Sequence, residues 1–274
     1  DAPGFGYEPM ARFDRARLRI KLMPLLLHRE ITVGTAVVEG LVLNLQENRH
    51  GVGNWEDLVA NNESLAENTE SGEQSEIDIS GIEFLDATIS YRDGASGAAY
   101  RLSELAIKMG RISGMEMLTI EGLTLEGILE GIAAEPSRLR VATTDIEIQT
   151  VQQVVALQTL ELEVLGIEIT ADVEPFSYAE GIEPVAVIQI AAFSPRKVMA
   201  QFDVEPPNTA DPGVLSHMSI SAKAHVTTAA FELSGVTMEL DDTTLTGKLS
   251  VPIDSSGTYR FDLVADTIDL NRYM

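Results

Sequence analysis

Residues 15–22 read RARLRIKL, with basic side chains at 15, 17, 19 and 21 and apolar side chains between them. Successive side chains of a β-strand point to opposite faces, so this alternation predicts a strand with one polar and one apolar face. The same period of two recurs along most of the chain, for example at residues 31–37, 85–91 and 167–169. The sequence therefore predicts a mainly β protein.

Helical signals are few and short. Ser194-Pro195 and Asp211-Pro212 each place an N-cap residue before a proline at the first helical position. Residues 151–158 (VQQVVALQ) fit a helix or a strand equally well. The closing residues 269–274 (DLNRYM) read as the end of a strand. We expect a few short helices beside the strands.

A weak internal repeat, apolar-x-Gly-apolar-x-apolar, surrounds five glycines: Gly40, Gly81, Gly122, Gly166 and Gly235. The apolar phase slips at each of them, and a glycine inside a strand often marks a bulge or a bend. Strands that bend at similar points indicate a long, curved, largely antiparallel sheet that forms a groove or a folded-over half-barrel. Because the pattern is common in β proteins, coincidence is the alternative interpretation.

The amino-acid composition excludes several kinds of partner and site. The 274 residues include 43 Asp and Glu against 19 Lys and Arg, for a net charge of −24, which argues against a nucleic acid as partner. The chain has no cysteine, so disulfides, thiolate nucleophiles and zinc–cysteine sites are excluded. We expect one β-rich region over residues 1–274, with a mobile acidic loop at 61–76 (NNESLAENTESGEQSE), a stretch too polar to order itself.

Catalytic chemistry finds little support. No pair among the four histidines has i,i+4 spacing, and His217 and His225, which could share a strand face, are read as ordinary surface or core histidines. No nucleophile elbow, P-loop or dinucleotide motif is present. Asp241-Asp242 is the tightest carboxylate pair, but adjacent strand residues point to opposite faces. We expect no catalytic residue, no metal and no cofactor, and hence not an enzyme. A carbohydrate-active β enzyme with two carboxylates in a cleft remains the enzymatic alternative.

Basic residues gather near the start of this acidic chain. Six of the 19 lie in the first 30 positions: Arg12, Arg15, Arg17, Arg19, Lys21 and Arg29. One interpretation is an end that faces anionic lipid headgroups. The other is a solvated strand face that guards an edge against unwanted pairing.

An ordered set of motifs resembles the AsmA-like proteins of Gram-negative bacteria. They are Ala2-Pro3-Gly4-Phe5, Pro24-Leu25-Leu26, the strand from Val38 to Leu45, and the turn Gly51-Val52-Gly53-Asn54-Trp55-Glu56-Asp57-Leu58. Residues 87–93, 100–102, 238–247 and 268–273 continue the likeness in order. The chain departs from the family pattern at Asp1, where Asn is usual, and at Asn271, where Asp is usual.

The resemblance implies a setting that the residues alone do not. AsmA-like proteins are anchored in the inner membrane by one N-terminal helix and extend into the periplasm. They are linked to outer-membrane assembly and are thought to carry phospholipid along a hydrophobic groove of a curved β-sheet. We expect this chain to be a middle section of the periplasmic part, cut from a longer chain and without the anchor.

The sequence hypothesis is therefore a non-enzymatic groove that holds or passes phospholipid acyl chains. Its candidate lining residues are Leu41, Leu43, Ile82, Phe84, Leu123, Leu125, Ile167, Ile169, Val236 and Met238. Two alternatives remain open. The apolar face packs as an ordinary filled core, or the protein is a scaffold that affects outer-membrane protein assembly through contacts with envelope assembly proteins.

Overall fold

The strands and their pairing follow the period-two alternation, and a computed structural model shows them in residues 5, 9–21, 32–56, 77–179, 181–253 and 257–274. These described residues form a mainly β, largely antiparallel fold with few short helices, which confirms the predicted fold class. The chain divides into two compact units, Asp1–Ser137 (unit 1) and Arg138–Met274 (unit 2). The acidic segment 61–76 and the motif Pro24-Leu25-Leu26 lie outside the described residues.

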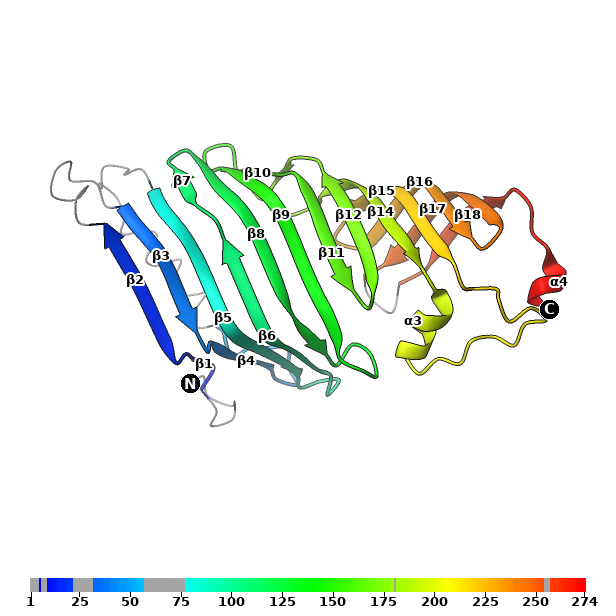
Figure 1. Cartoon of the computed structure of the whole chain (residues 1–274), viewed down its shortest axis with the longest axis horizontal. Helices are drawn as coiled ribbons and strands as arrows, with labels where there is room; N and C mark the ends of the chain where they lie inside the picture. Colours follow the sequence, from blue (N-terminus) through cyan, green and yellow to red (C-terminus); the bar gives the residue numbers. More distant parts are fainter. Residues whose placement is uncertain (1–4, 6–8, 22–31, 57–76, 180, 254–256) are drawn as a thin grey trace. The chain divides into compact units, whose positions relative to one another are not determined.

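Unit 1 is built around one long strand. Its strands are β1 (Ala11–Arg12), β2 (Arg15–Lys21), β3 (Thr32–Glu39), β4 (Val42–Glu47), β5 (Ile77–Asp93), β6 (Ala99–Met109), β7 (Ile112–Gly114) and β8 (Met117–Glu130). β3 and β4 pair in parallel with successive halves of β5, while β6 and β7 pair with its other side in antiparallel fashion (Figure 1). β8 continues the sheet beyond β6 and β7.

A row of glycines crosses β5, the junction of β6 with β7, and β8. The register on both sides of the row places Gly81 opposite Gly110 and Gly110 opposite Gly122. A Cβ added at Gly110 would lie 1.8 Å from the carbonyl oxygen of Glu121, so the backbones approach too closely for any side chain. Two of the glycines singled out by the repeat therefore share one line across the sheet.

A second line, of irregular backbone, runs from the β3–β4 junction across β5 and β6. Gly40, Asp86 and Glu104 have positive φ angles of 65°, 55° and 50°. The β5–β6 register shifts on either side of Ala87, and the β6–β8 register shifts between Ser103 and Ala106, which identifies β-bulges. Gly40 separates β3 from β4, so a bend predicted inside one strand is a junction between two.

Unit 2 continues the antiparallel pattern. Its elements are β9 (Ser137–Gln149), β10 (Val154–Leu157), β11 (Thr159–Val164), β12 (Ile167–Val173), β13 (Phe176–Ser177), β14 (Val185–Phe193), α3 (Pro195–Gln201), β15 (Met218–Val226), β16 (Ala230–Leu240), β17 (Thr243–Pro252), β18 (Arg260–Ala265) and α4 (Leu270–Tyr273). β9 pairs with β10 and β11, and the sheet then runs β11–β12–β14–β15–β16–β17–β18 (Figure 1).

Local predictions in unit 2 have mixed outcomes. The Ser194 hydroxyl accepts the Lys197 N–H at the start of α3, which confirms that helix start. Asp211-Pro212 opens a run of turns and not a helix. The ambiguous segment 151–158 contains strand β10. The strand expected at 269–274 is wrong: Asp269 caps the short helix α4, and its carboxylate accepts the Asn271 N–H.

Candidate functional site: an apolar sheet face

Cross-strand pairing gathers apolar side chains into rows on one face of unit 1. Directly paired residues share a face of the sheet, so each register line can be read across the strands. One row joins Val38, Phe84, Ile107 and Leu125. The next joins Ala36, Ile82, Met109 and Leu123, and a third joins Leu43, Ile89, Leu102 and Leu129.

These rows bring together the sequence-predicted residues of unit 1. Ile82 and Phe84 lie in the same rows as Leu123 and Leu125, linked by β6 residues that sequence reasoning did not single out. Leu43 pairs with Ile89 in the third row, and Leu41 lies between Gly40 and the first residue of β4. All six predicted side chains are half-buried.

Unit 2 repeats the arrangement over more strands. Its longest row crosses seven strands through Val141, Leu162, Ile169, Ile190, Ile220, Met238 and Leu245. Ile167 lies in the neighbouring row with Val164 and Leu139. Val236 belongs to the same face, two residues before Met238, but it is only 1% exposed, whereas Ile167, Ile169 and Met238 are half-buried.

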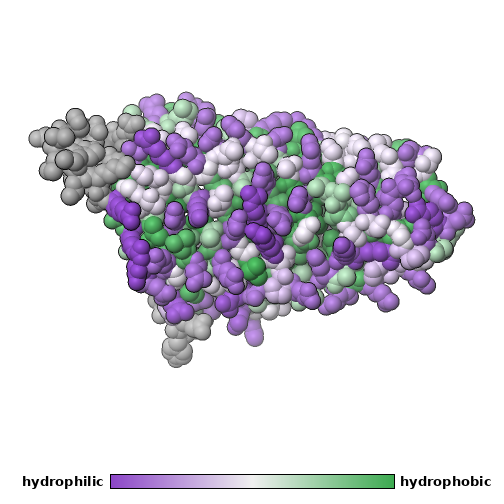
Figure 2. Space-filling view, viewed as in Figure 1, coloured by the Kyte–Doolittle hydropathy of each residue, from purple (hydrophilic) through white to green (hydrophobic). Residues whose placement is uncertain are grey.

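The apolar rows are covered only in part. Within the described residues, seven apolar side chains are buried: Ala87, Leu105, Ala142, Val214, Ala222, Ala224 and Val236. Four of them are alanines, so they bury little area. A filled core buries many large side chains, and the half-buried rows do not fit that alternative. Apolar surface accordingly appears among polar side chains in the space-filling view (Figure 2).

The opposite face carries the charge. Ion pairs across neighbouring strands lie on it, including Arg17 with Glu39 at 3.1 Å, Arg140 with Glu161 at 3.1 Å and Lys223 with Glu174 at 2.8 Å. All six side chains are substantially exposed, and such pairs contribute little to stability. These charged side chains make one face of the sheet hydrophilic, while the other face is apolar.

The Gly-Asn-Trp turn closes one end of the apolar face in unit 1. The Asn54 side-chain carbonyl accepts the Gln46 N–H at 3.1 Å, and its amide donates to the Asn44 carbonyl at 2.8 Å. The Asn54 side chain thereby makes the hydrogen bonds with the β4 backbone that a neighbouring strand would make. It positions the Trp55 ring 6.3 Å from the ring of Tyr91, which stacks on Tyr100.

Tyr91 is fixed at this aromatic end by a polar contact. Its hydroxyl donates a hydrogen bond of 2.9 Å to Glu47, and this bond to a carboxylate raises the pKa of Tyr91 above its usual value. A tyrosine with an apolar ring and a hydrogen-bonded hydroxyl is suited to a boundary between apolar and solvated surroundings.

The adjacent carboxylates Asp241 and Asp242 serve the structure of unit 2. Asp241 accepts the backbone N–H groups of Leu215, Ser216 and His217 at 2.6, 3.1 and 3.2 Å. Burial opposes ionisation of Asp241, but these bonds together lower its pKa. Asp242 pairs with Arg272, which also donates to Asp211 at 2.8 Å. The two carboxylates thus have separate partners and do not face each other across a cleft.

The described residues contain neither a metal-binding cluster nor a membrane-spanning helix. In that part of the chain, no group of three or more His, Asp or Glu side chains is arranged to hold a metal ion. None of its helices has the length and apolar character that a membrane crossing requires.

Comparison with known proteins identifies one relationship. The family model described as "AsmA family" matches residues 2–150, more than half of the chain. No curated protein matches the sequence. No solved structure matches it either.

Proposed function

Because the chain belongs to the AsmA family, whose proteins are associated with the bacterial envelope, outer-membrane assembly and lipid transport, we propose that its apolar sheet face holds phospholipid acyl chains. The observation that carries this proposal is the set of apolar rows that run across neighbouring strands yet stay half-buried. A row of this kind offers a continuous apolar track.

Energetics favour an acyl chain as the occupant. Burial of each methylene group contributes about 0.8 kcal/mol, so a chain of ten or more methylenes is held without any specific polar contact. Such a ligand needs no catalytic group, in keeping with a family that is generally non-enzymatic. We place the site in the periplasm of the full-length protein, tethered to the inner membrane by an N-terminal helix.

Neighbouring residues of β8 provide a sharp test. Leu125 lies in an apolar row, whereas Thr124 is paired with Lys108 on the opposite face. A benzophenone amino acid introduced at position 125 should cross-link to phospholipid in cells, and the same group at position 124 should not. Mass spectrometry of organic extracts from the purified wild-type protein should find co-purified phospholipid.

A pair of substitutions supplies the quantitative control. Leu125→Asp should reduce the co-purified lipid severalfold, while Thr124→Asp retains it, with the melting temperature of each variant measured to confirm folding. Equal cross-linking from positions 124 and 125, or lipid-free wild-type extracts, would contradict the proposal. Cross-links from position 125 to envelope proteins instead of lipid would favour the scaffold alternative.

A further inference from the structure

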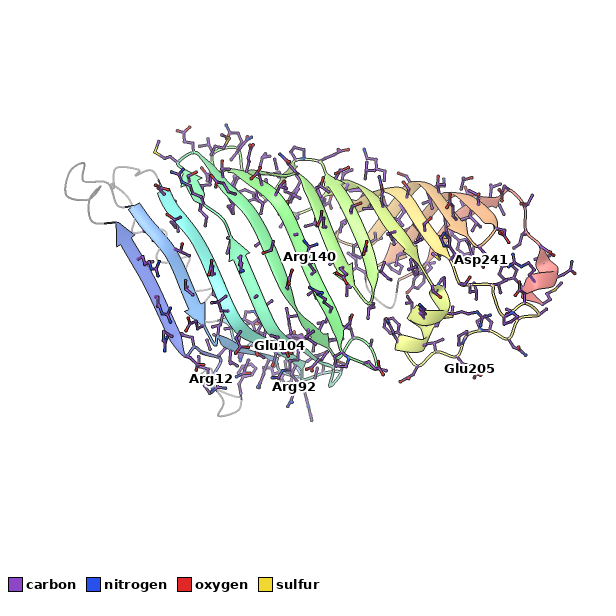
Figure 3. The ribbon with its side chains drawn as sticks, viewed as in Figure 1. Arg12, Arg92, Glu104, Arg140, Glu205 and Asp241 are labelled. Carbon is purple, nitrogen blue, oxygen red and sulfur yellow. The ribbon has the colours of Figure 1, made fainter. Side chains whose placement is uncertain are left out.

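Three arginines line two adjoining hollows at one end of unit 1. One hollow, of about 510 Å³, is lined by Pro9, Arg12, Val42, Asn44, Thr88, Ser90 and Arg101. The other, of about 750 Å³, shares Asn44, Ser90 and Arg101 with the first and extends to Arg92. Figure 3 shows Arg12 and Arg92 at the same end of the unit. We refer to Arg12, Arg92 and Arg101 with the space between them as the arginine pocket.

Strand register places the arginine pocket on the polar face. Arg12 pairs with Val42, which pairs with Thr88, and Asn44 pairs with Ser90, which pairs with Arg101. The apolar rows use the alternate residues of the same strands, such as Leu43 and Ile89. Direct pairs share a face and successive residues alternate, so the arginine pocket and the acyl-chain track lie on opposite sides of the sheet.

The charges in the arginine pocket are poorly compensated. Arg15 and Arg17 contact Glu39, and Arg111 contacts Asp78, whereas Arg19, Arg49 and Lys108 have no close acidic partner among the described residues. Arg12 and Arg92 make no ion pair or side-chain hydrogen bond with any residue that the structure describes. Arg101 has one long contact, 3.8 Å, with Glu130, whose carboxylate is the acidic group in the lining of the larger hollow.

The unpaired cations Arg19, Arg49 and Lys108 line neither of these hollows. Arg12 and Arg92 differ from them because each lines a hollow together with Arg101. An anion held in either hollow would therefore lie beside two guanidinium groups.

We propose that the arginine pocket binds the phosphate group of a phosphate ester. Guanidinium groups donate paired hydrogen bonds that match phosphate oxygens, and the Thr88 and Ser90 hydroxyls add donors in the same lining. The larger hollow, of about 750 Å³, has room for the organic group of an ester beside its phosphate. This site goes beyond the proposed acyl-chain function and does not depend on it.

The test uses two double variants of equal charge change. Calorimetric titration with sn-glycerol-3-phosphate at low ionic strength should show binding to the wild-type protein. Arg12→Gln/Arg92→Gln should weaken that binding at least tenfold. Arg15→Gln/Arg17→Gln, whose arginines pair with Glu39, should change it less than twofold. All four side chains are exposed, so the melting temperatures should stay close to that of the wild type.

A second ligand separates the sources of the phosphate. Dihexanoyl phosphatidylglycerol, used below its micelle concentration, carries the same group in a lipid headgroup. Tighter binding of this lipid than of glycerol phosphate, with the same loss in Arg12→Gln/Arg92→Gln, assigns the pocket to headgroups; the reverse order assigns it to soluble esters. Absence of binding for both ligands, or equal losses in the two double variants, overturns the proposal.

Discussion

The Tyr273 hydroxyl donates a hydrogen bond of 3.1 Å to the Asp241 carboxylate and so joins helix α4 to the β16–β17 turn. Burial, followed by this bond to a carboxylate, raises the pKa of Tyr273. The same carboxylate holds three consecutive backbone N–H groups of the segment before β15. One ionised side chain therefore fastens two segments to the end of unit 2.

Asp241→Asn should destabilise unit 2 and change its response to pH. Asn tolerates the positive φ of 51° at this position but accepts weaker hydrogen bonds, so we expect a loss of about 1–3 kcal/mol at neutral pH. The pKa of Asp241 is lower in the folded state than in the unfolded state. Its stabilising contribution is thus complete above the unfolded pKa of about 4 and is lost as pH falls toward the lower folded value.

Thermal unfolding of wild type and Asp241→Asn between pH 3 and pH 7 checks this sign. The difference in melting temperature should be largest at neutral pH and shrink toward pH 3. A difference that grows on acidification would contradict the assignment of Asp241 as an ionised anchor.

Leu105→Ala should cost about 2–5 kcal/mol of unfolding free energy, because the side chain is 0% exposed and its removal leaves a cavity behind the bulge. Leu18→Ala is the control on an exposed site, since Leu18 is 61% exposed, and it should cost less than about 0.5 kcal/mol. Urea unfolding monitored by circular dichroism measures both. Similar losses for the two variants would show that Leu105 is not part of a packed cluster.

Asn54→Ala should release the only tryptophan of the chain from its ring partner. The substitution removes two hydrogen bonds that hold the turn against β4, at a cost of about 1–3 kcal/mol. We expect the Trp55 emission to shift to longer wavelength and acrylamide quenching to increase. Tyr91→Phe keeps the ring beside Trp55 and should leave the emission nearly unchanged; an unshifted spectrum in Asn54→Ala would argue against the role given to Asn54.

Gly110→Ala should distort the glycine row of unit 1. Its Cβ would lie 1.8 Å from a backbone oxygen, so the strands must separate and lose hydrogen bonds, and we expect a loss above about 2 kcal/mol. Gly97→Ala tests conformation without crowding, because the space around Gly97 is open and only its φ of 77° opposes alanine. It should cost about 1 kcal/mol. Equal melting temperatures for the two variants would count against close strand approach at Gly110.

The period-two alternation was enough to predict the fold class, because within each strand it shows which residues share a face of the sheet. The repeat of glycines was a weaker guide. Gly235 lies at a bulge between β16 and β17, as predicted, but Gly166 lies in the turn between β11 and β12, where Leu165 and Gly166 both have positive φ. A two-residue turn and a bend inside a strand have the same local signature.

Other features depend on register and were beyond the reach of one sequence. The bulges at Asp86 and Glu104 place non-glycine residues at positive φ, for which the local sequence gives no signal. The arginine pocket joins Arg12, Arg92 and Arg101, which become neighbours only through the pairing of β1, β4, β5 and β6. The basic cluster noticed near the start contains one of these arginines, while two others, Arg15 and Arg17, are paired with Glu39.

The scarcity of fully buried side chains has a consequence for how each unit evolves and unfolds. Because each unit has only a small hydrophobic core, a strand is stabilised mainly by the two strands with which it pairs. Loss of structure should begin at the outer strands and advance stepwise, so amide exchange should slow progressively toward β5 in unit 1. Insertion or deletion of a hairpin that keeps the strand register would lengthen or shorten the apolar rows. Strands far from the change would keep their pairing.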